Sequence, residues 1–199
     1  MSYVKYTYVD SVTGAPVTHE PAVNGPAMPN IIGLQFDFAL ESQYPTHAPV
    51  MYGTCASVGD EALGVLAVIT RAEFDKAKID ELAARAAKAR TEAMTSIAER
   101  RWRCEVAGTM LYGRRIETDR TAVAMVTGAA LAASLDPGYS VRWKAADGFV
   151  TLNAEQILAM AQAIRSHVQA CFDREADLLD ALDAGTYETE MLDTGWPDA

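Results

Sequence analysis

The chain has 199 residues, half of them hydrophobic, and its 27 acidic and 17 basic side chains give a formal charge of −10. Its apolar residues form no run near the roughly 20 that a membrane-spanning helix needs, so no membrane partner is expected. A phosphate backbone is repelled by so acidic a chain, so no nucleic acid partner is expected either. The N-terminus lacks the features of a signal peptide, and three separated cysteines without CxxC spacing indicate reduced thiols, so we expect a cytoplasmic protein.

Residues 1–69 are predicted to form a β-rich docking module. This stretch holds six of the eight prolines and few charged residues, a composition typical of strands and loops. Alternation of polar and apolar residues from Tyr3 to Val9 predicts a half-buried strand. Further strands are expected at residues 31–40, 50–55 and 63–69, which gives a module of three to four strands.

Residues 70–107 are predicted to form a helical connector. Thr70 and Glu73 fit a capping box at its start, and no glycine or proline interrupts the chain before Gly108. Ile79 and Leu82 begin a face that continues with alanines, so the face offers little apolar bulk. Two interpretations stay open: a solvated connecting helix, or a seam at which copies of the chain associate. Ile79 and Leu82 are therefore candidate interaction residues.

Residues 108–199 are predicted to form an α+β domain in which hairpins alternate with helices. The first hairpin turns at residues 112–113, where glycine suits a tight turn, and the second turns at residues 147–148. Asn153 is the expected cap of the last helix. The predicted fold class is therefore α+β, with a small β-rich N-terminal module, a connecting long helix and a helix-hairpin-helix-hairpin-helix C-terminal domain.

The core of this domain is expected to lie against the last helix. Alternation along residues 140–144 places Trp143 on the face opposite Arg142 and Lys144, so Trp143 is predicted to be buried. Its expected neighbours on the last helix are Val168, Cys171 or Phe172.

No catalytic motif is present: the sequence has no phosphate-binding glycine loop, no GxSxG and no HExxH. His167 and Cys171 stand four residues apart, a helical spacing at which two ligands can share a metal. Cys171 lies on an apolar stripe, however, where a thiol behaves as a small hydrophobic group. We therefore predict no metal site, no cofactor and no enzymatic activity.

Arg114, Arg115 and Trp196 are further candidate interaction residues. The two arginines belong to a set of six between residues 100 and 120, whereas residues 173–198 hold nine acidic residues and one basic residue. This pattern favours docking on an acidic partner, or on the chain's own tail, over binding to nucleic acid. Trp196 either packs into its own core or anchors a neighbour.

Four blocks of the C-terminal half carry a resemblance. They are RRWRCEVAG at residues 100–108, GRRIETDR at 113–120, VRWKAADGFVTL at 141–152 and HVQACFDRE at 167–175. In this order they resemble an uncharacterised domain family of bacteriophage and prophage tail-region proteins, over about residues 94–187. The resemblance implies a tail-fibre-associated or baseplate-associated role and supplies no catalytic residues.

The resemblance leads to an expected function. The chain is expected to be a structural protein of the phage tail, in contact with other tail proteins of the fibre or baseplate. The alternative is a tail-fibre assembly chaperone that is not retained in the virion. The expected location is the host cytoplasm during assembly and then the virion tail. A homo-oligomer is expected, a trimer before a dimer because phage fibres are commonly threefold.

Overall fold

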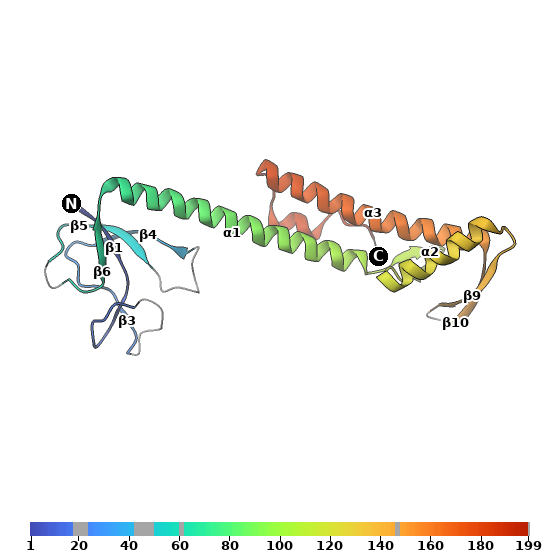
Figure 1. Ribbon diagram of the computed structural model, residues 1–199, viewed down its shortest axis with the longest axis horizontal. Coiled ribbons are helices and arrows are strands. Elements are labelled where there is room, and N and C mark those ends of the chain that lie inside the picture. The colour runs from blue at the N-terminus through green and yellow to red at the C-terminus, as the bar shows by residue number, and fades with distance from the viewer. Residues whose placement is uncertain (18–23, 42–49, 60–61, 146–147, 199) are drawn as a thin grey trace. The chain divides into compact units, whose positions relative to one another are not determined.

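The computed structural model describes residues 1–17, 24–41, 50–59, 62–145 and 148–198. The chain forms two compact units, residues 1–89 and 90–199. Their boundary falls inside helix α1 (Arg71–Glu105), so the connector expected at residues 70–107 is shared between the two units. The predicted α+β class is confirmed: a strand-rich N-terminal sheet is followed by a long helix and then by further helices (Figure 1).

The first unit is built on a four-stranded antiparallel sheet with the strand order β4-β5-β1-β6. Its strands are β1 (Ser2–Tyr6), β4 (Gln35–Ala39), β5 (Met51–Cys55) and β6 (Val65–Ile69). Strand β1 is central because it pairs with both β5 and β6. A smaller antiparallel pair is formed by β2 (Val9–Asp10) and β3 (Pro26–Ala27).

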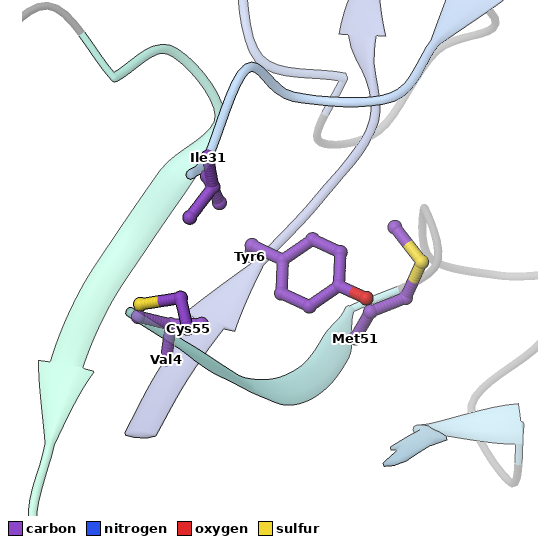
Figure 2. Close-up of a cluster of buried hydrophobic side chains, with 5 residues drawn as sticks. All are labelled: Val4, Tyr6, Ile31, Met51 and Cys55. Atoms are coloured by element: carbon purple, nitrogen blue, oxygen red, sulfur yellow. The ribbon is translucent and has the colours of Figure 1, made fainter. Parts of the chain in front are cut away.

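One face of the sheet holds a compact apolar cluster, drawn in Figure 2. Its buried members are Val4, Tyr6, Ile31, Met51 and Cys55. Val4 and Tyr6 share this face because side chains alternate along a strand, and both are fully buried. The Tyr6 hydroxyl points toward Met51 and has no hydrogen-bond partner among the described residues (Figure 2). Burial also raises the pKa of Tyr6.

The other face of the sheet is covered by the start of α1. Phe74 is buried and its ring lies 4.9 Å from Tyr3 and 5.5 Å from Phe38. Phe38 and Tyr52 stack with ring centroids 4.6 Å apart. Aromatic pairs in tilted, offset or edge-on contact add about 0.5–1.5 kcal/mol beyond the area that they bury. Phe74 therefore fastens the first turn of α1 to the sheet.

The first turn of α1 is capped as predicted. The Thr70 hydroxyl accepts a hydrogen bond from the Glu73 backbone N–H at 3.2 Å, and the Glu73 carboxylate accepts one from the Thr70 N–H at 2.7 Å. The helix then runs for 35 residues without a break, because neither glycine nor proline interrupts it. Among the residues that the structure describes, no helix has the length and apolarity needed to cross a bilayer.

The loop after β2 is organised by the Asp10 side chain. Its carboxylate accepts hydrogen bonds from the backbone N–H groups of Thr13 at 2.8 Å, Asn24 at 2.9 Å and Val12 at 3.0 Å, and from the Asn24 side-chain amide. These hydrogen bonds hold the pKa of Asp10 well below its usual range, and the bond from the Thr13 N–H contributes most. The ionised carboxylate is thus part of the fold of this unit.

The second unit combines three helical segments with two antiparallel hairpins. Its elements after α1 are β7 (Thr109–Leu111), β8 (Arg114–Ile116), α2 (Arg120–Leu135), β9 (Ser140–Ala145), β10 (Gly148–Asn153), α3 (Ala154–Ala184) and the 3-10 helix η2 (Thr189–Asp193). Asn153 caps α3 as predicted, in a capping box with Gln156. The turn expected at residues 147–148 lies partly outside the described residues.

The second half of α1 packs along α3 (Figure 1). Three contacts join them: Arg90 with Asp183, Arg101 with Glu175, and the Cys104 carbonyl with the His167 ring. Residue numbers rise along α1 as they fall along α3, so the two helices are antiparallel. Ile97 of α1 and Leu178 of α3 are both buried.

Trp143 packs against the last helix as predicted, but it is half-buried rather than buried. It packs against a cluster between α2 and α3 whose buried members are Val126, Met160 and Ile164. Val168 packs against the same cluster, whereas Phe172 is 43% exposed and the Arg101 guanidinium lies 4.6 Å from the centre of its ring. Trp143 also lines an open groove, and this leaves part of its surface uncovered.

Candidate functional site

A groove of about 790 Å³ is bounded by the two hairpins of the second unit and by α2 and α3. We call it the hairpin groove. Among the described residues, its charged lining consists of Arg114, Arg115, Arg142, Lys144, Glu117 and Asp119, and its aromatic lining of Tyr112, Trp143 and Phe149. Aliphatic and methionine side chains, with Thr121, Thr151 and Gln156, make up the rest of the described lining. A hollow with an apolar lining and a few charged groups is the usual form of a binding site.

The first hairpin brings Arg114 and Arg115 to the groove. Its turn residues, Tyr112 and Gly113, both have positive φ, 51° and 74°, as a tight two-residue hairpin turn requires. The Arg115 guanidinium donates a hydrogen bond to the Ala107 carbonyl. Its side chain passes so close to Gly108 that a Cβ there would lie 3.0 Å from Arg115 Nε. Gly108 therefore makes room for the arginine.

The base of this hairpin is fixed to the end of α1 by Thr118. The Gly108 N–H donates to the Thr118 hydroxyl at 2.9 Å, and that hydroxyl donates to the Glu105 carbonyl. Thr118 is buried, so both backbone groups depend on it for a partner. Asp119, the next residue, caps α2 by accepting from the N–H groups of Thr121 and Ala122.

The second hairpin supplies the rest of the basic lining. Lys144 lies directly across the strand pair from Phe149, and the Arg142 guanidinium is 5.3 Å from the centre of the Phe149 ring. Side chains from both faces of this hairpin line the groove, including Trp143 on the inner face, so the groove wraps around the hairpin's edge. Alternation along the strand places Arg142 and Lys144 on the face opposite Trp143, so the sequence predicts that this pair is exposed. No local pattern in the sequence connects the pair with Arg114.

Four of the six arginines between residues 100 and 120 fall into two pairs that differ in their contacts. Arg101 pairs with Glu105 and Glu175, and Arg103 lies 3.6 Å from Glu99, so these two are engaged by carboxylates of α1 and α3. The other pair, Arg114 and Arg115, is exposed at the hairpin groove. The groove thus gathers basic side chains that are not engaged in the packing of α1 on α3.

The remaining predicted interaction residues are not among the described residues that line the groove. Ile79 and Leu82 are 67% and 59% exposed on the part of α1 that belongs to the first unit. Trp196 is half-buried, and its indole N–H donates to the Leu192 carbonyl at 2.8 Å. Arg100 donates to the same carbonyl at 3.2 Å. The segment with Trp196 is therefore held against its own unit, and its role as an anchor stays a prediction.

His167 and Cys171 are both buried inside the second unit. The His167 Nε2 atom lies 2.9 Å from the Cys104 carbonyl and 3.9 Å from the Cys171 sulfur. A carbonyl only accepts, so Nε2 carries the proton and donates it. Burial, and then the proximity of Cys104 and Glu105, raises the pKa of Cys171 to about 11. The thiol is thus protonated at neutral pH, a poor state for a metal ligand or nucleophile.

A known protein family matches most of the second unit. Residues 86–194 match a family described as a domain of unknown function, DUF4376. The chain belongs to this family. The DUF4376 region contains the whole hairpin groove, whereas Ile79, Leu82 and Trp196 fall outside it. No curated protein and no solved structure matched the chain.

Proposed function

We propose that this protein is a structural component of a bacteriophage tail, associated with the fibre or baseplate, that acts by binding other tail proteins. One observation carries the proposal. Two of the four blocks that resemble phage tail-region proteins, residues 113–120 and 141–152, supply most of the lining of the hairpin groove. The part of the chain that carries the resemblance therefore also lines a groove whose side chains suit binding.

The side chains in the groove suit a protein partner. Tyrosine, tryptophan, methionine and arginine are enriched where proteins bind one another, and all four types line this groove. Of the two carboxylates there, Asp119 caps α2, an arrangement that serves folding rather than acid–base chemistry. The proposal therefore assigns no catalytic activity and no cofactor to the protein.

An assembly chaperone that binds tail-fibre proteins and then leaves is the second candidate, because it would use the same kind of surface. The two functions differ in what the finished virion contains. Quantitative mass spectrometry of gradient-purified particles, with a major tail protein as the internal standard, separates them. We expect a fixed number of copies per particle. A protein abundant in the lysate and missing from the particles would support the chaperone and overturn the structural role.

A further inference from the structure

The described lining of the hairpin groove has the opposite charge to the protein as a whole. Of the described residues that line it, four carry basic side chains and two carry acidic ones, on a chain with a formal charge of −10. Electrostatic interactions in physiological salt are screened beyond about 8 Å. A ligand seated in the groove is therefore influenced mainly by the local charge, which is positive.

Tyr112 is an unusual residue for its position. It is 80% exposed and has a φ of 51° at the first central position of a two-residue hairpin turn. Asparagine, aspartate and glycine are favoured there, because a left-handed backbone crowds a larger side chain. Neither burial nor turn geometry accounts for tyrosine here. An aromatic group held at the mouth of a binding groove does account for it.

Phe149 is a second exposed aromatic ring in the same groove, with 63% of its surface exposed. Its contact with Arg142, 5.3 Å from the guanidinium carbon to the ring centre, places a positive charge beside an apolar surface. A ligand that meets this pair gains most if it carries a negative charge next to an apolar side chain.

We propose that the hairpin groove binds an acidic peptide segment of a partner protein. The carboxylates of the segment pair with Arg142 and Lys144. Its apolar side chains pack against Tyr112 and Phe149. The inference rests on the proposed function only in taking the partner to be a protein.

The alternative polyanion, a nucleic acid strand, fits less well. A peptide segment can place a few carboxylates inside the groove and continue with neutral residues. A nucleic acid carries a phosphate at every nucleotide, so it must continue over the acidic surface outside the groove. The aliphatic and methionine lining also suits leucine or phenylalanine side chains better than a sugar–phosphate backbone.

Peptide selection on the purified full chain tests the proposal. A displayed library of random peptides is selected on the protein, and the affinity of the recovered peptides is measured by fluorescence anisotropy at low and high salt. Oligothymidine and a lysine-rich peptide are measured beside them. The groove variant is Arg142→Glu with Lys144→Glu. Its matched control is Arg120→Glu with Arg165→Glu, which changes the net charge equally at exposed positions outside the groove lining.

We expect the selected peptides to be enriched in aspartate, glutamate and aromatic residues. The groove variant should bind them about tenfold or more weakly, and the control variant within about twofold of the parent. Tyr112→Asn gives a second, independent test, since asparagine suits the turn better than tyrosine. That variant should fold at least as well as the parent and bind the peptides about fivefold or more weakly.

Several results would overturn the proposal. They are a selection without acidic enrichment, equal binding by the groove variant and its parent, and tighter binding of oligothymidine than of the best peptide. Concentration-dependent self-association that depends on Arg142 and Lys144, in the absence of peptide binding, would assign the groove to a second copy of the chain instead. None of these results depends on whether the protein remains in the virion, so failure here is distinct from failure of the proposed tail function.

Discussion

Truncation of Phe74 to alanine should destabilise the first unit and leave the second unit unchanged. Phe74 is 4% exposed and contacts three aromatic rings, the farthest of which, Tyr52, is 6.3 Å away. Removing a buried phenylalanine costs about 3–5 kcal/mol, through lost transfer free energy and the cavity left behind. A unit of this size is stabilised by roughly 4–13 kcal/mol. The truncation therefore removes at least about a quarter of the unfolding free energy of this unit.

The chain offers a convenient assay for this prediction. All three tryptophans, Trp102, Trp143 and Trp196, belong to the second unit, so their fluorescence in a urea titration reports on that unit. The near-ultraviolet dichroism has contributions from tyrosines of both units, so the part of its transition that the tryptophan fluorescence does not share reports on the first unit. We expect Phe74→Ala to lower the midpoint of the tyrosine signal and to leave the tryptophan midpoint in place.

The control variant lies on the same helix. Ile79→Ala removes a side chain that is 67% exposed, so its effect should stay within about 0.5 kcal/mol. If Phe74→Ala shifts both signals together, the two units do not unfold separately. If it shifts neither signal, the aromatic cluster does not fasten α1 to the sheet.

Three further predictions concern single features of the first unit. Tyr6→Phe should leave the unit as stable as the parent or more stable in urea titration, because it removes a buried hydroxyl without a partner; a loss above about 1 kcal/mol would reveal a partner. Asp10 has a lowered pKa in the folded state, so its stabilisation is complete above the ordinary carboxyl value of about 4 and is lost as the pH falls through the folded-state value. Asp10→Asn should therefore be less stable than the parent at pH 7 and should flatten the fall in stability below about pH 4, and an unchanged pH profile would contradict this account. Ile79→Asp with Leu82→Asp should convert an oligomer into monomers in sedimentation, while the urea midpoint of the tryptophan signal stays in place. A parent protein that is monomeric at high concentration would contradict association through this face of α1.

Features determined by neighbouring residues could be read from the sequence. The caps at Thr70 and Asn153 depend on residues within one helical turn. The strand at β1 follows from alternation of its side chains. The class α+β and the long helix α1 follow from these local signals, together with the concentration of prolines in residues 1–69.

Features determined by distant contacts could not be read in this way. Arg114 and Arg142 meet at one groove only because two hairpins converge, and no spacing in the chain encodes that meeting. Phe172 and Cys171 are both expected neighbours of Trp143, but consecutive helical residues differ by about 100° around the axis. Cys171 therefore occupies the core, and Phe172 faces outward to Arg101. Trp143 was predicted to be buried from its strand face, and the groove beside it leaves it half-buried.

Carbodiimide cross-linking of purified phage particles tests the central claim most directly. Lys144 is the one lysine in residues 90–199, so any amine cross-link from the body of this unit begins in the hairpin groove. The account predicts a zero-length cross-link from Lys144 to an aspartate or glutamate of another tail protein. Particles that carry Lys144→Arg should keep the protein and lose this cross-link. A protein present in the particles whose Lys144 forms no cross-link to another tail protein, while its other lysines do, would contradict the claim.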